Sequence, residues 1–426
     1  MTRRSALGCM VLSAVLATAL SGCSGTLDSL GKDPTELPTT FEAVTKPTNY
    51  PNTFSTLLKK SDSDVSNKIG DAFDQLFLHG DPGTQVIYYP RGDDQAAILD
   101  ILHGNVRTEG MGLAMLIAVE LDKQDVFDRL WTFSKVWLRQ DSGAAHGYFK
   151  SYCGEGTQGV AGTFCYDVYG MQQFVLALMF ADGRWHSTTV QPYASDALAL
   201  LDVLQNKELE NGGVKPIDDG GVMQDVGSAF DPTTHLVREE PTVAAAGYTR
   251  SALEMPAAYE LWAQATGNTF WSDAADAARA HVVAAADATT GLWPIRSFFD
   301  GSPVPDSSTF TQQAYRTHLN LALDALWGTE TADETAVADR VLGFFAQNPD
   351  TYGGTFALDG TPIDTSRAQA LISANGALAV ASSRSDRTAF VNAVWAQAIP
   401  TGDNRYYDGL MYLMSLLVLS GQLRVW

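Results

Sequence analysis

The stretch that decides the fold is Gly110–Leu121, GMGLAMLIAVEL, followed at once by KQDVFDRLWTFSKVW over 123–137. The first segment is apolar on all sides, whereas the second carries apolar residues mostly at three- and four-residue steps and has a clear polar face. A helix that is apolar all round must be buried, and a polar-faced neighbour must cover it. The pair therefore predicts an inner helix and an outer helix of a helical protein.

The same alternation continues along the chain. Near the C-terminus LMYLMSLLVLSG (410–421) is again apolar all round, while TFWSDAADAARAHVV (269–283) has a polar face. Apolar periodicity and helix-ending residues predict twelve helices. We place them at 65–79, 108–122, 124–139, 169–183, 191–206, 249–265, 269–285, 310–327, 331–347, 366–382, 385–397 and 404–421.

Six successive pairs of this kind favour an all-α fold, an (α/α)6 barrel of six helical hairpins. An open helical solenoid is the competing architecture, but no fixed repeat of 34 or 40 residues supports it. Short strands are expected only at places such as Val86 to Tyr89 and Leu292 to Phe299. The longer connections lie at 80–107, 140–168, 207–248 and 286–309, and long loops on a rigid scaffold commonly carry a functional site.

The charge balance narrows the classes of partner. Lys and Arg number 28 against 49 Asp and Glu, which gives a formal net charge of −21. Such a surface repels phosphate backbones and anionic headgroups, so neither nucleic-acid binding nor electrostatic membrane docking is expected. The sequence also contains no apolar run of the roughly 18 residues that a membrane-spanning helix needs.

The first residues are typical of an export signal. Arg3 and Arg4 precede an apolar stretch at 6–20, and Leu20-Ser21-Gly22-Cys23 resembles a bacterial lipobox, in which the cysteine is lipidated. An ordinary cleaved signal with an incidental cysteine is the alternative. We expect a lipoprotein signal peptide at 1–22, a lipidated flexible tether at 23–50 and one domain at 51–426. The expected location is a bacterial membrane, with the domain periplasmic or at the cell surface and held only through the lipid.

The remaining cysteines and the histidines bear on disulfides and metals. Cys153 and Cys165 would pair in an oxidising compartment, although two free thiols are the other interpretation. The seven His residues show no spacing typical of metal ligands, and the two cysteines do not form a C-x-x-C motif. We expect no metal and no cofactor.

Several motifs resemble one known family. The run VRTEGMGLAMLIAVELDKQDVFDRLW (106–131) resembles the acid-bearing motif of glycoside hydrolase family 8. LDGTPI (358–363) and the C-terminal stretch 399–426 resemble the ending of that family, especially of the reducing-end xylose-releasing exo-oligoxylanases. Gly147-Tyr148-Phe149, the segment 255–262, and Ala314-Tyr315-Arg316 with Asn320 and Asp324 fit as well, in the right order.

The resemblance implies an (α/α)6 barrel that cleaves β-1,4-linked glycans with inversion. In that reaction a protonated carboxyl donates to the glycosidic oxygen, and a carboxylate roughly 6.5–9.5 Å away takes a proton from water on the opposite face. Glu109 matches the acid. Taken without this resemblance, a single Glu in a first helical turn is usually only a partner of the helix dipole.

The position of the base departs from the family pattern. Where the exo-oligoxylanases carry an Asp before Ala-aromatic-Arg, this chain has Gln313, which cannot accept a proton. A second family Asp aligns with Tyr169, and Asp167 stands two residues earlier. A family Trp that would stack on sugar is replaced by Ser151.

Two interpretations of these losses remain open. A base can come from another place, with Asp167 the first candidate; acids of the 207–248 loop and the next helix follow, namely Asp218, Asp219, Asp225, Asp231, Glu239, Glu240 and Glu254. Alternatively the chain is a noncatalytic glycan-binding lipoprotein on a degenerate hydrolase barrel. A lyase or epimerase on a similar barrel is a third interpretation.

The sequence thus predicts a glycoside hydrolase, an enzyme that cleaves O-glycosyl bonds, here in xylan-derived oligosaccharides. The expected catalytic residues are Glu109 and Asp167. Substrate-binding residues are expected to be Arg107, Gln313, Tyr315, Arg316, Tyr406 and Tyr407. Trp293 is a further candidate for the groove wall, although it could equally fill the core. The expected partner is an oligosaccharide or polysaccharide, and we expect a monomer.

Overall fold

The computed structural model describes residues 37–154, 166–219, 222–242 and 247–426. Pro38–Trp426 forms one compact unit. Residues 38–50, which we expected to belong to the tether, are part of this unit and form hydrogen bonds with the rest of it. The Glu42 N–H donates to the Ala265 carbonyl at 2.8 Å, and the Tyr50 hydroxyl accepts from the Val425 N–H at 3.0 Å.

Helices make up most of the unit, and all twelve expected helices are present. They are α2 (Asp62–Phe73), which continues as a π-helical turn (Asp74–His79), α3 (Thr108–Glu120), α4 (Gln124–Trp137), α5 (Val168–Trp185), α6 (Tyr193–Glu210), α7 (Pro256–Thr266), α8 (Thr269–Ala285), α9 (Tyr315–Trp327), α10 (Ala332–Phe345), α11 (Gln369–Leu378), α12 (Thr388–Ala396) and α13 (Arg405–Ser420). A short helix α1 (Thr53–Leu58), which the sequence analysis missed, precedes them.

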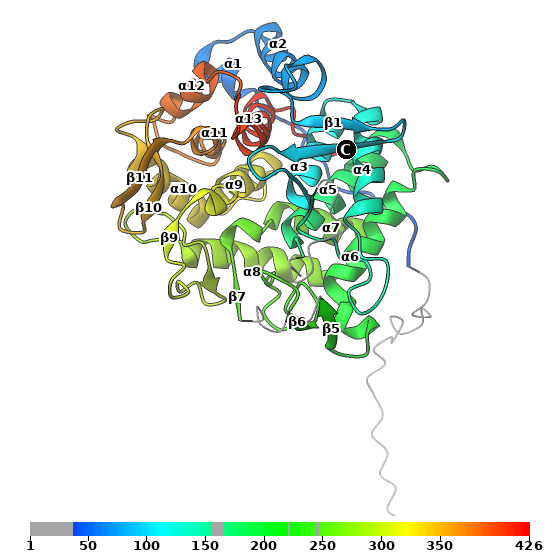
Figure 1. Cartoon of the computed structure of the whole chain (residues 1–426). Helices are drawn as coiled ribbons and strands as arrows, with labels where there is room; N and C mark the ends of the chain where they lie inside the picture. The colour runs from blue at the N-terminus through cyan, green and yellow to red at the C-terminus, as the bar shows by residue number, and fades with distance from the viewer. Residues whose placement is uncertain (1–36, 155–165, 220–221, 243–246) are drawn as a thin grey trace, which may run out of the picture. The chain divides into compact units, whose positions relative to one another are not determined.

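The helices form an (α/α)6 barrel. On the inside α3 contacts α5 and α13, α9 contacts α7 and α11, and α11 contacts α13, while each inner helix also contacts the outer helix beside it in sequence. Figure 1 shows α1 and α2 beside α12 and α13, so the two ends of the domain close the ring. The inner helices are buried almost throughout; in α3 only Glu109 keeps appreciable exposure.

Helices α7 and α9 begin well after the predicted starts at 249 and 310 because of local backbone geometry. Helix α7 begins at Pro256, which occupies its first position, since the preceding Glu254 is extended and Ser251–Leu253 forms a separate 3-10 turn. Helix α9 begins at Tyr315 after a 3-10 turn over Gln312–Ala314, in which the Gln313 N–H donates to the Thr311 hydroxyl. Both irregular entries lie next to the cavity described below.

The described residues also form short antiparallel strands. Strands β1 (Tyr88–Arg91), β2 (Gln95–Asp100), β3 (Asn105–Arg107) and β4 (Tyr152–Gly154) form one sheet in that order. Strands β9 (Thr309–Phe310), β10 (Gly353–Ala357) and β11 (Pro362–Arg367) form a second, with β10 in the middle. Two ribbons complete the set, β5 (Lys215–Asp219) with β6 (Val222–Val226), and β7 (Tyr248–Thr249) with β8 (Ser297–Phe298).

The membrane and disulfide predictions concern residues both inside and outside the described part of the chain. None of the helices in the described part of the chain is long and apolar enough to cross a membrane. Cys23 lies outside the described residues, as does Cys165, so the lipidation and disulfide predictions are untested. The backbone of Cys153 pairs with Val106 in the four-stranded sheet.

Candidate active site

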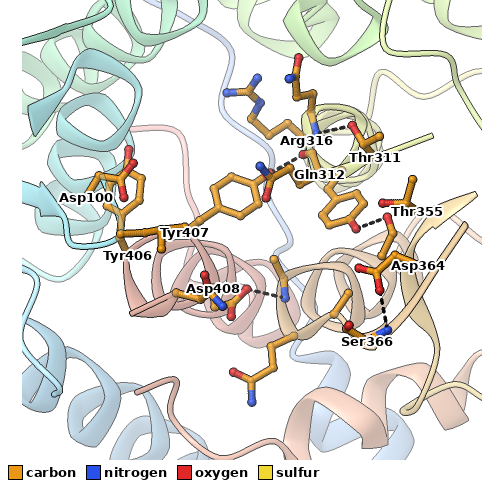
Figure 2. Close-up of a pocket in the computed structure, with 18 of the residues that line it drawn as sticks. Asp100, Thr311, Gln312, Arg316, Thr355, Asp364, Ser366, Tyr406, Tyr407 and Asp408 are labelled. Carbon is orange, nitrogen blue, oxygen red and sulfur yellow. Dashed lines mark hydrogen bonds between the residues drawn. The ribbon is translucent and has the colours of Figure 1, made fainter. Parts of the chain in front are cut away.

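A cavity of about 770 Å³ opens among the starts of the inner helices α3, α9, α11 and α13 and the β10–β11 hairpin. Side chains from the β3–α3 junction, the 3-10 turn before α9, strand β11 and the start of α13 line it, as Figure 2 shows for part of the set. Seven of the eight residues predicted for catalysis or substrate binding are among the lining residues. They are Arg107, Glu109, Gln313, Tyr315, Arg316, Tyr406 and Tyr407.

Glu109 stands in the first turn of α3, where the helix dipole favours a negative charge. The next residue, Gly110, allows close packing of α3 against α13. A Cβ atom at this position would lie 2.4 Å from the ring and hydroxyl of Tyr406, which no side chain could occupy without displacing that ring. The T-E-G sequence therefore brings the carboxylate and a buried tyrosine to the same wall of the cavity.

Arg316 is the charged partner of Glu109. Its Nη1 forms an ion pair with Glu109 Oε2, and its guanidinium lies 4.3 Å from the ring centroid of Tyr169. The Arg316 side chain is 7% exposed. Burial opposes its positive charge, but the negative charges around it together, that of Glu109 first, raise the pKa of Arg316 above its usual value.

Asp167 lies directly behind this pair. It caps α5, and its carboxylate accepts from the Gly170 N–H at 2.9 Å. Gly170 packs so tightly against the backbone of Thr108 and Glu109 that a Cβ there would meet it at 2.6–2.7 Å. Burial, followed by the charge of Glu109, raises the pKa of Asp167 to about 6. The structure thus brings Asp167, which is half-buried, next to Glu109, although Asp167 is not among the residues that line the cavity.

Of the predicted aromatic residues, the tyrosines line the cavity and Trp293 lies in the core. The Tyr407 hydroxyl donates to the Gln312 carbonyl at 2.8 Å, and the Tyr315 hydroxyl donates to the Gly354 carbonyl at 2.5 Å. Tyr406 is 4% exposed, and its hydroxyl has no hydrogen-bond partner among the described residues. Trp293, by contrast, is fully buried and donates to the Val282 carbonyl at 2.8 Å. The groove-wall prediction for Trp293 is wrong, because its indole fills the core.

A second charged pair, Asp100 with Arg107, also lines the cavity. Asp100 accepts from Arg107 Nε at 2.7 Å and contacts His103 Nδ1 at 2.7 Å. Figure 2 shows Asp100 beside Tyr406. Sequence reasoning identified Arg107 and missed Asp100, although Asp100 ends a strand seven residues earlier in the chain.

Gln313 is exposed, lines the cavity and is hydrogen-bonded to an arginine. Arg250 Nη1 donates to Gln313 Oε1, and Arg250 Nη2 forms an ion pair with Glu239. Glu239 is 5% exposed and also pairs with Arg296, whose Nε lies 2.6 Å from its second carboxylate oxygen. Sequence reasoning missed Arg250, since its link to Gln313 joins residues 63 positions apart.

The other acids considered as bases are occupied elsewhere or not described. Glu254 is fully buried, accepts from the Val237 N–H and the Thr249 hydroxyl, and has its pKa raised to about 8 by burial. Asp231 caps a turn by accepting from the Thr234 N–H at 2.8 Å. Asp225 is exposed outside the cavity, Glu240 is half-buried, and the side chains of Asp218 and Asp219 lie outside the described set.

Several carboxylates line the cavity. Apart from Glu109, none of them was among the candidate acids and bases of the sequence analysis. Among the described residues they are Asp100, Glu109, Asp364, Asp403 and Asp408. Asp408 accepts from the Ala370 N–H at 3.1 Å, and burial raises its pKa to about 6. Asp364 accepts from the Ser366 N–H at 2.8 Å on the exposed strand β11. Figure 2 shows both bonds.

The comparisons with known proteins agree on one family. The profile described as Glycosyl hydrolases family 8 matches residues 100–421. A reducing end xylose-releasing exo-oligoxylanase of Halalkalibacterium halodurans is 31% identical over 394 residues, which cover 88% of this chain and 95% of that protein. Endoglucanase A of Acetivibrio thermocellus is 27% identical over 329 residues, which cover 74% of this chain and 61% of that protein.

Solved structures give the same result. The structure described as a GH8 xylobiose complex from Teredinibacter turnerae superposes with a TM-score of 0.82 at 32% identity, covering 88% of this chain and 98% of that one. The structure of Rex8A from Paenibacillus barcinonensis complexed with xylose has a TM-score of 0.78 at 28% identity, covering 88% of this chain and 97% of that one.

Proposed function

Because the chain belongs to glycosyl hydrolase family 8, we propose that it is a lipid-anchored inverting glycosidase that acts on β-1,4-linked, xylan-derived oligosaccharides. The family membership makes it a glycoside hydrolase. The substrate, the stereochemistry and the anchor are our proposals, and the exo-oligoxylanase and xylanase relatives support the first of them.

The observation that carries the proposal is the placement of Glu109. Its carboxyl lines a cavity large enough for sugar residues, and Arg316 forms an ion pair with it. In the proposed reaction Glu109 gives its proton to the oxygen of the departing sugar as the bond to the anomeric carbon breaks. Loss of the proton leaves a carboxylate, which Arg316 stabilises through the ion pair already present in the structure.

The remaining lining residues suit a neutral, hydroxyl-rich ligand. The tyrosines at 315, 406 and 407 offer apolar ring faces that can pack on sugar C–H surfaces. Arg107 and Asp100 offer a paired donor and acceptor for hydroxyl groups on the same wall. Polar groups placed around apolar faces are the usual arrangement for orienting a small ligand.

The N-terminal sequence supports the anchored form. We propose that the signal 1–22 is removed and that Cys23 carries the lipid, which places the barrel in the periplasm or at the cell surface of a bacterium. Labelling with a radioactive fatty acid tests this proposal: the wild-type chain should incorporate label and Cys23→Ser should not. Incorporation by the variant would contradict it.

Product analysis tests the activity. The full chain is incubated with xylo-, cello- and chito-oligosaccharides of matched length, and products are separated by chromatography. We expect cleavage of the xylo-oligosaccharides and little or none of the other two. Preferred cleavage of cello- or chito-oligosaccharides would overturn the substrate proposal and leave the glycosidase assignment intact.

One observation favours a second candidate function. Gln313 cannot accept a proton, so a noncatalytic glycan-binding lipoprotein remains the alternative. It predicts saturable binding of oligosaccharides by calorimetry, no cleavage at any pH between about 4 and 8, and unchanged affinity in Glu109→Gln. Cleavage of any of the three substrate series excludes it.

A further inference from the structure

A second cavity, of about 620 Å³, lies outside the candidate active site, and the two share no lining residue. Its volume falls within the range of about 300–1,000 Å³ that small-ligand sites usually have. One face of α10, the loop residues 289–290, the turn 359–360 of the β10–β11 hairpin and Arg384 form its walls, and we call it the α10 groove. The hairpin contributes to both cavities, because its strand residues Thr355 and Asp364 line the active-site cavity.

The walls of the α10 groove are held together by close contacts. Gly291 has a φ of +76°, and a Cβ atom there would lie 2.9 Å from the Val341 nitrogen, so the loop packs directly on α10. The Thr290 hydroxyl donates to the Leu358 carbonyl at 2.7 Å, which joins the same loop to the hairpin. The groove is therefore formed before a ligand binds, and little ordering of the protein opposes binding.

Arg340 is the charged group of the groove that has no partner. It is half-buried, its Nε atom is buried without an acceptor, and its guanidinium makes no hydrogen bond or ion pair with any other described residue. Arg384, by contrast, is engaged, because its Nε and Nη2 bind the two oxygens of Asp386 at 2.8 and 2.6 Å. Buried polar atoms in folded proteins are normally hydrogen-bonded. The free donors of Arg340 therefore indicate a place where a ligand oxygen can bind.

The charges that line the α10 groove balance. Asp339 and Asp359 stand against Arg340 and Arg384. This lining favours an ion of neither sign, but it offers hydrogen-bond donors and acceptors together. A neutral ligand rich in hydroxyl groups, each of which both donates and accepts, matches it best.

Phe344 adds an apolar surface to the groove. It stands one turn after Arg340 on the same face of α10. Its ring meets that of Phe356 edge to face, with 5.3 Å between the centroids, and a Cβ atom at Gly360 would lie 2.6 Å from it. The ring is only half-buried, so part of it stays open to the groove. Aromatic surfaces of this kind pack on the C–H surfaces of sugar rings.

From these observations we propose that the α10 groove is a second, noncatalytic binding site for a neutral β-1,4-linked xylan chain. Arg340 donates to sugar hydroxyls, and Phe344 packs on a sugar ring. The inference rests on the proposed function, because it takes the class of glycan from there. Its role is to retain a long chain on the protein, beside the hairpin that also lines the active-site cavity.

Retention on a polymer tests the proposal. The full chain carrying Glu109→Gln, which prevents cleavage during the assay, is mixed with insoluble linear xylan that bears no charged groups, and the apparent Kd is obtained from the unbound protein. Adding Arg340→Gln should weaken retention about tenfold, the loss expected for a hydrogen bond to a charged group. The matched control adds Arg129→Gln instead, which removes an arginine of α4 that pairs with Asp125, and should leave the Kd unchanged.

Two further measurements separate the groove from the active site. In chains with Glu109 intact, Arg340→Gln should leave kcat/KM on xylotriose unchanged, because cleavage of a short substrate does not need the groove. Phe344→Leu keeps an apolar contact with Phe356 but loses the flat ring, and it should weaken retention as well. This variant keeps the proposal testable should Arg340→Gln not fold.

The outcomes distinguish the two claims. Retention of both groove variants equal to that of the parent chain would overturn the second site, and the proposed function would stand if xylotriose is cleaved. A large loss of kcat/KM on xylotriose in Arg340→Gln would also overturn the second site, since Arg340 would then act on the active site. Retention only of xylan that bears uronic acid would overturn the choice of a neutral ligand. Failure of the unaltered chain to cleave xylotriose would overturn the proposed function, whereas retention needs no cleavage and would still decide the second site.

Discussion

Replacing Glu109 with Gln removes the charge of this side chain while keeping its shape. The amide cannot donate the proton that the departing sugar needs, and general acid catalysis is worth about 10²–10⁴-fold. We therefore expect kcat on xylo-oligosaccharides to fall by that factor. Substrates with a good leaving group, such as aryl xylosides, should lose much less, since their departure needs little protonation.

The effect on stability follows from two opposed changes. In Glu109→Gln, Arg316 loses an ionic partner but keeps an acceptor, because the amide oxygen of the substituted side chain would still receive a hydrogen bond; Asp167 loses a repelling neighbour. Hydrogen bonds to charged groups contribute about 1.5–3 kcal/mol, so the free energy of unfolding should fall by no more than about 2 kcal/mol at pH 7. The pKa of Asp167, about 6 in the unaltered chain, should also fall.

Three measurements check this reasoning. Steady-state kinetics on both substrate types give the change in activity, urea unfolding gives the free energy, and carboxyl NMR gives the titration of Asp167. Full activity in Glu109→Gln would refute the acid role. A loss of stability far above about 2 kcal/mol, with activity lost equally on both substrate types, would show that Glu109 is mainly a structural partner of Arg316.

Three further predictions concern packing, pH and the cavity wall. Gly110→Ala should lower the free energy of unfolding by about 1–3 kcal/mol and reduce activity, because its methyl group displaces the Tyr406 ring. A free energy of unfolding in urea equal to that of the unaltered chain would contradict this. Burial raises the pKa of Glu254 from 4.5 to about 8, so the folded state binds its proton more tightly than the unfolded state and stability should fall as pH rises between those values. Glu254→Gln should reduce that fall, which urea unfolding at about pH 5 and pH 9 measures; an identical fall in both proteins would sink the argument. Tyr407→Phe loses the bond to Gln312 and should lower kcat/KM about fivefold, as expected for a bond worth about 1 kcal/mol, whereas no change in kinetics would remove Tyr407 from the site.

The alternation of buried and polar-faced helices was sufficient to predict the barrel. A segment such as GMGLAMLIAVEL has no polar face to expose, so only an inner position is open to it. Local backbone effects were harder to predict. The extended conformation at Glu254 and the proline at 256 shorten one predicted helix. Strands β10 and β11 were not predicted, and β11 takes the first two residues of the helix expected at 366–382.

The site was predictable only where one motif carried it. Glu109 and the tyrosines near the C-terminus belong to local runs that resemble a family, and they line the cavity as expected. The partner of Gln313 could not be found this way, because Arg250 reaches it from 63 residues away through a turn whose shape no local pattern encodes. The position of Asp167 next to Glu109 could not be predicted either, because it depends on how closely α5 packs on α3.

The central claim is that Glu109 protonates a β-linked sugar in this cavity while the nucleophile attacks from the opposite face. Proton NMR of the first product formed from xylotriose tests it most directly. The account predicts that the new anomeric centre appears first in the α configuration, as free sugar, and that Glu109→Gln abolishes this signal. A product that appears first in the β configuration would contradict the account.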